Sequence, residues 1–382
     1  MKKAVLAFLM LLCFCISCAA PGAAESNLFL EDYDQLWEDL QKNYPFFPVL
    51  EQQGVDVDAI RQTYRTYAQN ADTTEEFMKT LDLLFAKLYC FAHLSLIHKD
   101  RYVMLVESEA LRDSVSFAPW LEVLHDPVTE QAYASLSASE PPRQTDAPPV
   151  THSYYEDLHT AYFRFPVMDG QDQTIIADYL SQLSNVEHII IDVTGNPGGS
   201  TLYWEEVIVK PFGGSWSAEF PVYYPDSPLV QKYYGSQNLQ PIVETNNLPP
   251  FVSALNAKWF SISGWDLHCG EPTVKNGVHA QRWVLIDGGG YSATEAFASF
   301  CKLTGWAKLV GTPTAGDGLG GQPILLQLKN TGLLVYFSTA MATNPDGSLN
   351  TAQGVSPDYN NPPKQSLSPL ELCLNTIQSE TP

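Results

Sequence analysis

The chain has 382 residues and a formal net charge of −22, from 21 Lys and Arg against 43 Asp and Glu. Hydrophobic residues make up 45% of the chain and charged residues only 17%, whereas about 25% of an average soluble protein is charged. This composition excludes a disordered or low-complexity protein, and the negative field argues against a nucleic-acid partner. At roughly 100 to 200 residues per domain, the length predicts two or three compact units.

The N-terminus has the pattern of an export signal. Two lysines precede an apolar run at residues 4–12, which is too short to span a membrane but long enough for a signal-peptide core. Ile16-Ser17-Cys18 resembles the lipobox of bacterial lipoproteins, while residues 22–24 offer an ordinary cleavage site. We favour lipid attachment at Cys18 and assign residues 1–24 to the signal. We therefore expect an exported bacterial protein, secreted or held at the cell surface, that contacts the membrane only through this N-terminal anchor.

Removal of the signal leaves four cysteines, namely Cys90, Cys269, Cys301 and Cys373. They are too sparse for a disulfide scaffold, and one or two bridges stay open as alternatives. No spacing typical of a metal site occurs.

Residues 25–90 have the pattern of an N-terminal helical domain. The apolar side chains on one stripe of its first helix are Tyr33, Trp37, Leu40 and Tyr44. Two further stripes follow, and the second of them lies behind a capping box at residues 73–76.

Residues 91–150 are predicted to connect this domain to the rest of the chain through strands and a linker. Side chains alternate in character from residue 90 to residue 97, which is the period of a strand, and this predicted strand contains His93. Four prolines among small polar residues at 135–150 indicate a linker.

Residues 151–382 form the predicted core, which is of the α/β class. Strands are predicted at residues 161–165, 188–193, 283–287 and 308–310, helices at 176–183 and 293–303, and a hairpin at 324–338. Their β-α-β order predicts a parallel or mixed sheet. Residues 212–282, rich in Pro, Tyr, Asn and Trp, match no element pattern and are interpreted as an insertion near the site.

Two turns in this core could carry chemistry. One is a glycine-rich turn after a buried strand, where the amides of Gly198 and Gly199 could face a negatively charged oxygen. In the other, a strand turns into a helix that starts at Ser292. A serine there is placed to be a nucleophile, with the amide of Ala293 as a donor to the oxyanion.

Each of these features also has a purely structural explanation. An isolated Gly-Gly pair is more often a tight turn than a binding site. Ser292 and Glu295 fit the capping box S-x-x-E, so Ser292 could simply cap its helix. A histidine flanked by apolar residues, as His93 is, is by itself more often packed than catalytic.

Taken in chain order, these segments resemble the tail-specific, or C-terminal processing, peptidase family, which includes the tricorn protease core and the repeats of interphotoreceptor retinoid-binding protein. The matching segments are residues 36–60, 191–199, 291–295, 310–316 and 354–358. The resemblance covers most of the mature chain and implies a crotonase-like β-β-α superhelical core with an N-terminal helical cap domain. Only about 60 residues separate His98 from His159, and they include the proline-rich linker, so we expect no PDZ domain.

The resemblance implies that Ser292 attacks a peptide carbonyl with His93 as general base, as in the tricorn-like branch. It also implies an oxyanion hole made by the amides of Ala293, Gly198 and Gly199. The substrate is then a peptide or a protein, and no metal or organic cofactor is implied. The oligomeric state stays open.

The chain departs from the family pattern at three places. The tail-specific branch has a lysine base 25 residues after the serine, where this chain has Asp317, so a Ser-Lys dyad is excluded. The tricorn-like branch orients its histidine with a glutamate just before residues 354–358, where this chain has Thr351-Ala352-Gln353. Thr194 replaces an arginine that commonly precedes Gly-Asn. The candidates for the third catalytic member are Asp317, Asp346, Gln353 and Asp358.

The leading hypothesis is an exported serine peptidase with a Ser-His catalytic arrangement. The missing lysine and glutamate support an alternative, a catalytically weakened or inactive peptidase-like protein that binds ligands at the cell surface. A third hypothesis is an esterase or amidase that acts on a small substrate. An acid within about 3 Å of His93 would favour the first hypothesis over the second.

Overall fold

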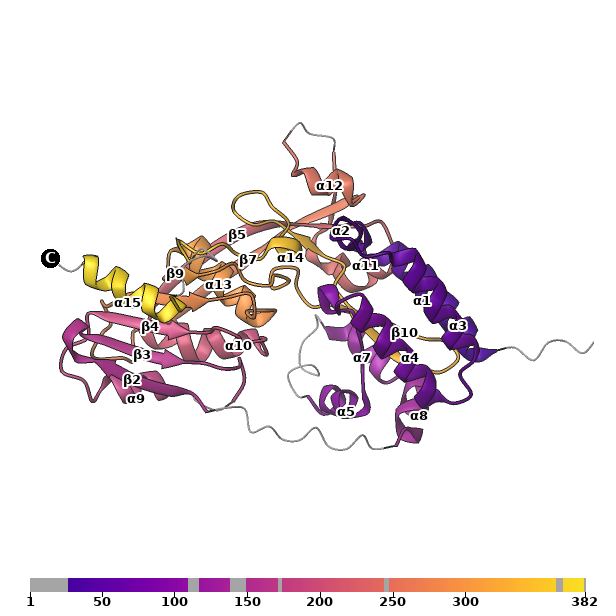
Figure 1. Ribbon diagram of the computed structural model, residues 1–382, viewed down its shortest axis with the longest axis horizontal. Helices are drawn as coiled ribbons and strands as arrows, with labels where there is room; N and C mark the ends of the chain where they lie inside the picture. The colour runs from indigo at the N-terminus through magenta and orange to yellow at the C-terminus, as the bar shows by residue number, and fades with distance from the viewer. Residues whose placement is uncertain are drawn as a thin grey trace, which may run out of the picture.

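The computed structural model describes residues 27–108, 117–137, 149–170, 174–243, 247–361 and 367–380. The predicted signal segment with Cys18, and most of the proline-rich linker, lie outside these residues. Two hydrophobic cores are joined by a long two-stranded ribbon, as Figure 1 shows. No helix in the described ranges is both long and apolar enough to cross a membrane.

The first core is built on a six-stranded mixed sheet with the order β13-β9-β8-β4-β3-β2. Its strands are β2 (Thr151–Tyr155), β3 (Thr160–Arg164), β4 (His188–Asp192), β8 (Gln281–Ile286), β9 (Lys308–Gly311) and β13 (Tyr359–Asn360). β2 pairs antiparallel with β3, and all other neighbours in the sheet are parallel. The predicted α/β class and mixed sheet are confirmed.

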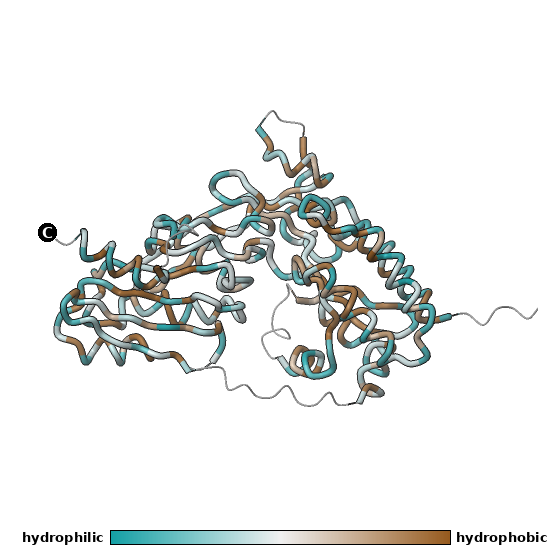
Figure 2. Tube along the Cα trace, in the orientation of Figure 1, coloured by the Kyte–Doolittle hydropathy of each residue, from teal (hydrophilic) through white to brown (hydrophobic). Residues whose placement is uncertain are grey.

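Helices cover both faces of this sheet. Alternate residues of β4 and β8 pack on one face against α9 (Ile175–Leu180) and α13 (Ala293–Thr304), and the remaining ones pack against α15 (Pro369–Glu380). Burial on both faces is the reason that β4 is an unbroken apolar run in the sequence. The apolar residues gather along the strands and helices of the two cores (Figure 2).

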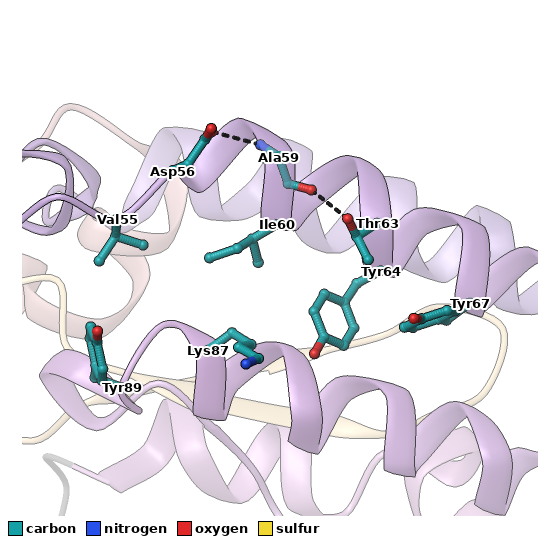
Figure 3. A pocket seen from close by; sticks show the side chains of 9 residues that line it. All are labelled: Val55, Asp56, Ala59, Ile60, Thr63, Tyr64, Tyr67, Lys87 and Tyr89. Atoms are coloured by element: carbon teal, nitrogen blue, oxygen red, sulfur yellow. Dashed lines mark hydrogen bonds between the residues drawn. The ribbon is translucent and has the colours of Figure 1, made fainter.

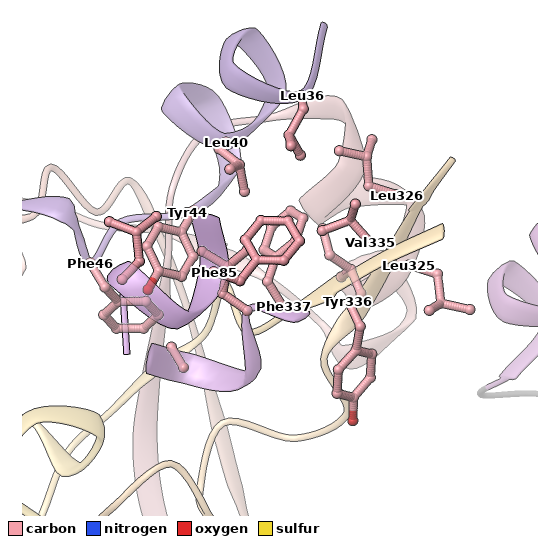
Figure 4. Close-up of a cluster of buried hydrophobic side chains, with 14 of the residues drawn as sticks. Leu36, Leu40, Tyr44, Phe46, Phe85, Leu325, Leu326, Val335, Tyr336 and Phe337 are labelled. Carbon is pink, nitrogen blue, oxygen red and sulfur yellow. The ribbon is translucent and has the colours of Figure 1, made fainter. Parts of the chain in front are cut away.

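The second core contains the N-terminal helices, so the predicted helical region is confirmed. These helices are α1 (Leu28–Asn43), α2 (Phe47–Gln52), α3 (Val57–Gln69) and α4 (Thr74–Lys87), followed by α5 (Lys99–Glu107), α7 (Ala118–Leu124) and α8 (Pro127–Ser135). They pack on a small sheet that consists of β1 (Ser95–Leu96), β11 (Leu334–Phe337) and β10 (Ile324–Gln327). The hairpin predicted at 324–338 thus leaves the large sheet and completes the N-terminal core, where Leu40 and Phe337 share one cluster (Figure 4).

The ribbon that joins the two cores is formed by β5 (Gly214–Tyr224) and β7 (Trp259–Gly270), with β12 (Met341–Ala342) and β6 (Gln240–Pro241) at its edges. Trp216, near the start of β5, packs on the core of the large sheet, whereas Phe220 and the residues after it belong to the N-terminal core. The segment 212–282, which matched no sequence pattern, is therefore a structural bridge. Two short helices, α11 (Pro228–Tyr234) and α12 (Pro250–Ala254), lie between its strands.

The strand predicted at residues 90–97 is wrong except at Ser95 and Leu96. Phe91–His93 forms a 3-10 turn, and four residues in and before it have a positive φ of 47° to 60°, namely Tyr89, Cys90, Ala92 and His93. Burial still alternates along this turn, which imitates the period of a strand without an extended backbone. The described part of the predicted connection is also mainly helical, as α5, α7 and α8.

Asp32 of α1 fastens the β10–β11 turn to the helix. Its carboxylate is fully buried and accepts hydrogen bonds from the backbone amides of Asn330 and Thr331, at 2.9 and 2.7 Å. The Thr331 hydroxyl donates a third bond of 2.7 Å. Bonds to an ionised acceptor are stronger than bonds between neutral groups, so this carboxylate stabilises the contact between α1 and the β10–β11 turn.

We expect Asp32→Ala to lower the free energy of unfolding by about 2 kcal/mol, because two half-buried amides and the Thr331 hydroxyl lose their acceptor. Urea unfolding followed by circular dichroism measures this loss. Asp34→Ala on the same helix is the control, since the Asp34 carboxylate is 45% exposed and pairs with Arg65. That variant should lose less than about 1 kcal/mol; equal losses in both variants would contradict the role of Asp32.

Candidate active site

Ser292 stands where β8 turns into α13. Its backbone has φ 55° and ψ −117°, a conformation that costs a residue other than glycine about 1–3 kcal/mol and is typical of functional sites. The side chain makes no capping hydrogen bond. Helix capping therefore does not explain this serine, and its hydroxyl points elsewhere.

His93 reaches Ser292 from the other core, in the turn that follows α4. Its Nε2 lies 3.0 Å from Oγ of Ser292, although 199 positions separate the two residues. The side chain of His93 is 13% exposed, and its backbone φ is also positive, at 60°. Tertiary packing, and not local sequence, brings this pair together.

The carboxylate of Asp317 lies on the other side of the His93 ring. Its Oδ2 accepts a hydrogen bond from Nδ1 of His93, and the Asp317 side chain is only 2% exposed. Asp317 has a positive φ as well, at 62°, in a turn between two glycines. With the proton of His93 on Nδ1, the lone pair of Nε2 faces the Ser292 hydroxyl, which is the tautomer that a general base requires.

Two further hydroxyls hold this arrangement, and the sequence analysis missed both. The Tyr291 hydroxyl accepts a hydrogen bond from the backbone N–H of His93 and donates one to Oδ2 of Asp317, each 2.9 Å long. Ser338 Oγ donates to the same oxygen at 3.1 Å. Burial and the Asp317 charge hold the pKa of Tyr291 far above its usual value, so this hydroxyl stays a donor. The only sequence signal for Tyr291 is its place before Ser292, and Ser338 has none.

The turn at Gly198 and Gly199 packs directly on the start of α13. A Cβ atom on Gly198 would lie 2.6 Å from the carbonyl oxygen of Tyr291 and 3.0 Å from the amide nitrogen of Ala293. The Gly198 amide donates to Oδ1 of Asn196 at 2.9 Å, so it is occupied in holding the turn. The amides of Ala293 and Gly199 have no acceptor within the described residues, and these two stay the predicted oxyanion donors.

An arginine still reaches the turn before Gly195-Asn196, although the sequence has Thr194 there. Arg164 of β3 donates to Oγ1 of Thr194 at 2.9 Å and to Oδ2 of Asp192 at 3.0 Å. The parallel register of β3 and β4 sets Arg164 opposite Asp192. A cross-strand side chain thus supports this turn.

The other candidates for a third catalytic member lie away from His93. Asp346 accepts hydrogen bonds within its own turn and, with Gln353, lines a hollow of about 480 Å³ beside α12. Asp358 forms an ion pair with Lys302. Of the four candidates, only Asp317 contacts the histidine within the described structure.

A separate hollow of about 470 Å³ lies between α3 and α4, as Figure 3 shows. Tyr64, Tyr67 and Lys87 are among its lining residues, and it ends at Tyr89, four positions before His93. None of the residues that line it belongs to the Ser292 site.

Within the described residues, no group of three or more His, Cys, Asp or Glu side chains is arranged to hold a metal ion. The four cysteines that follow the predicted signal are all free, so neither of the bridges left open by the sequence is formed.

Two family models match this chain in sequence. Residues 159–361 match the family model of Peptidase family S41, and residues 27–86 match that of the Tricorn protease C1 domain. A search of curated proteins gave no match.

Solved structures share the fold at low sequence identity. A candidate peptidase from Parabacteroides merdae ATCC 43184 is 17% identical with a TM-score of 0.55, covering 91% of this chain and 96% of that chain. Mature CPAF complexed with lactacystin is 14% identical with a TM-score of 0.51, covering 92% of this chain and 97% of that chain. Similarity at this level of identity extends to the fold alone.

We expect Gly198→Ala to destabilise the protein by about 3 kcal/mol or more, because its φ of 103° and its contact with the Tyr291 carbonyl both oppose a Cβ atom. Thermal unfolding measures the effect. Gly195→Ala is the matched control, since its φ of 69° is also positive but a Cβ would meet nothing within 4 Å. The control should lower the free energy of unfolding by only about 1–2 kcal/mol. An equal loss in Gly198→Ala would contradict a tight contact between Gly198 and the start of α13.

Proposed function

Because the chain belongs to peptidase family S41, we propose that it is a serine peptidase in which Ser292 is the nucleophile, His93 the general base and Asp317 the residue that orients the histidine. One observation carries this proposal: an unbroken contact runs from Ser292 Oγ through the imidazole of His93 to the carboxylate of Asp317. The family makes a peptide or protein the substrate.

In the proposed reaction, Nε2 of His93 takes the proton of the Ser292 hydroxyl while Oγ attacks a peptide carbonyl carbon. The new C–O bond turns the carbonyl oxygen into an oxyanion, which accepts hydrogen bonds from the amides of Ala293 and Gly199. The imidazolium, stabilised by Asp317, gives its proton to the leaving amine as the C–N bond breaks. A water molecule then repeats these steps on the acyl-enzyme and releases the second product.

The place of Asp317 accounts for two departures from the family pattern together. It stands where the tail-specific branch has its lysine, and it contacts His93 as the missing glutamate would in the tricorn-like branch. Tyr291 and Ser338 both donate to this buried carboxylate. An acid so closely fixed against the histidine supports an enzyme over an inactive binding protein.

We expect Ser292→Ala and His93→Ala to abolish labelling by a fluorophosphonate probe and to lower kcat for peptide hydrolysis by about 10³-fold or more. Asp317→Asn should lower kcat by about 10²- to 10⁴-fold, since an amide no longer stabilises the imidazolium. Mass spectrometry of the labelled protein identifies the modified residue, and circular dichroism checks that each variant is folded.

Asp346→Asn is the control for this series. It makes the same chemical change as Asp317→Asn at an acid that bonds only within its own turn, so kcat should stay within about twofold of the wild type. Unchanged hydrolysis by Ser292→Ala would overturn the proposal. Cleavage of small esters with no peptide cleavage would make the protein an esterase instead.

We also propose export with a lipid at Cys18, supported by the N-terminal sequence alone. In a bacterial host, Cys18→Ala should move the protein from the membrane fraction to the soluble exported fraction, because the buried acyl chains are lost. Membrane attachment that persists in this variant, or a wild-type chain that stays in the cytoplasm, would contradict this localisation.

A further inference from the structure

Glu295 is a buried acid that has no role in the proposed mechanism. It lies one turn after Ser292 on α13, and its side chain is inaccessible to solvent. Oε1 accepts hydrogen bonds from Nδ2 of Asn350, at 2.5 Å, and from Oγ of Ser299, at 3.3 Å. Oε2 has no hydrogen-bond partner among the described residues. A buried carboxyl oxygen without a partner is costly and calls for an explanation.

Three pieces of the site meet at this carboxyl group. Asn350 begins α14 (Asn350–Gln353), and its Oδ1 accepts a hydrogen bond from the amide of Gly318 at 3.3 Å. Gly318 follows Asp317 and lies so close to α13 that a Cβ there would be 2.7 Å from the Cβ of Glu295 and 2.5 Å from the carbonyl oxygen of Ser292. Glu295 thus connects the helix of the nucleophile, through Asn350, to the turn of Asp317.

The surroundings of Glu295 favour its neutral form. Burial raises the pKa of Glu295 to about 7, against the opposing effects of Thr314, Asn350, Gly316 and Ser299. Of the charged groups on the elements packed around it, Asp317 faces His93, and Lys302, two turns further along α13, pairs with Asp358. α14 carries no titratable residue. No cation is therefore at hand to balance an ionised Glu295.

We propose that Glu295 is a positioning residue that works as a neutral acid and holds α14 and the Asp317 turn against the nucleophile helix. Its ionisation places a charge in the interior that no cation balances, and the cost of burying this charge destabilises the packing of α14 and the Asp317 turn on α13 and slows the reaction. The inference rests on the proposed function, because it assigns a means of regulating the same site by pH.

The protonation of Glu295 can be tested without any enzymatic activity. A folded-state pKa raised from 4.5 to about 7 means that the folded protein holds a proton which the unfolded chain releases. Stability from this group is thus complete below about pH 4.5 and is lost as the pH rises through about 7. In a Ser292→Ala background, Glu295→Gln should remove this decline from the unfolding curves, whereas Glu219→Gln, at an exposed site on β5, should keep it.

The positioning role is tested by kinetics. Glu295→Ala should lower kcat by about tenfold or more, and Glu295→Gln, which keeps the size and neutral charge of the acid, should restore it to within about threefold of the wild type. Wild-type kcat should fall by about fivefold between pH 7 and pH 8, as the protonated fraction of a single group with a pKa of about 7 does, whereas Glu295→Gln should lack this fall.

The outcomes separate the two proposals. A wild-type protein that neither reacts with the fluorophosphonate nor cleaves peptides overturns the proposed function and, with it, the catalytic role of Glu295. Two results overturn the positioning role alone, provided that the wild-type protein is active. In one, the kcat of Glu295→Gln is no higher than that of Glu295→Ala. In the other, the kcat of Glu295→Gln falls at alkaline pH as much as that of the wild type.

Discussion

The contact between His93 and Asp317 is the constraint on which the arrangement of the molecule depends. His93 belongs to the N-terminal core and Asp317 to a turn beside α13, so their hydrogen bond forms only when the two cores are docked. The β5–β7 ribbon has one end in each core, and the chain after Asp317 passes into the N-terminal core, where it forms the β10–β11 hairpin. Much of the fold outside the large sheet serves to bring three side chains within hydrogen-bond distance.

All three of these side chains stand on backbone that their residue types avoid. Ser292, His93 and Asp317 have φ values of 55°, 60° and 62°, in the left-handed region where a Cβ atom is unfavourable. Local propensity therefore opposes the site at each position. The surrounding tertiary contacts offset that cost, among them the Tyr291 hydroxyl, which binds the His93 backbone and the Asp317 carboxylate at once. The site is consequently a product of the whole fold rather than of its own loops.

The same fact explains what the sequence could and could not predict. Buried strands such as β4, and the helix behind Ser292, follow from periodicity, because local pattern and final structure agree there. Asp317 was only one of four candidates, since nothing in the order of residues shows that its turn lies next to a histidine 224 positions away. Arg164 reaches Thr194 across strands, and sequence neighbours of Thr194 give no hint of it. Residues 90–97 have the sequence pattern of a strand because burial alternates along them, but this alternation comes from a 3-10 turn and not from an extended backbone.

The place of the β10–β11 hairpin in the N-terminal core also affects the order in which the molecule folds. β1 and the N-terminal helices have no complete sheet to pack on until residues 324–337 have been made and delivered to them. The first part of the chain to leave the ribosome is therefore among the last to reach its final structure, as pairings between distant segments form slowly. A nascent chain that has not yet reached residue 324 contains Ser292 without a docked His93. The topology therefore makes the contact between His93 and Ser292 one of the last features of the fold to form.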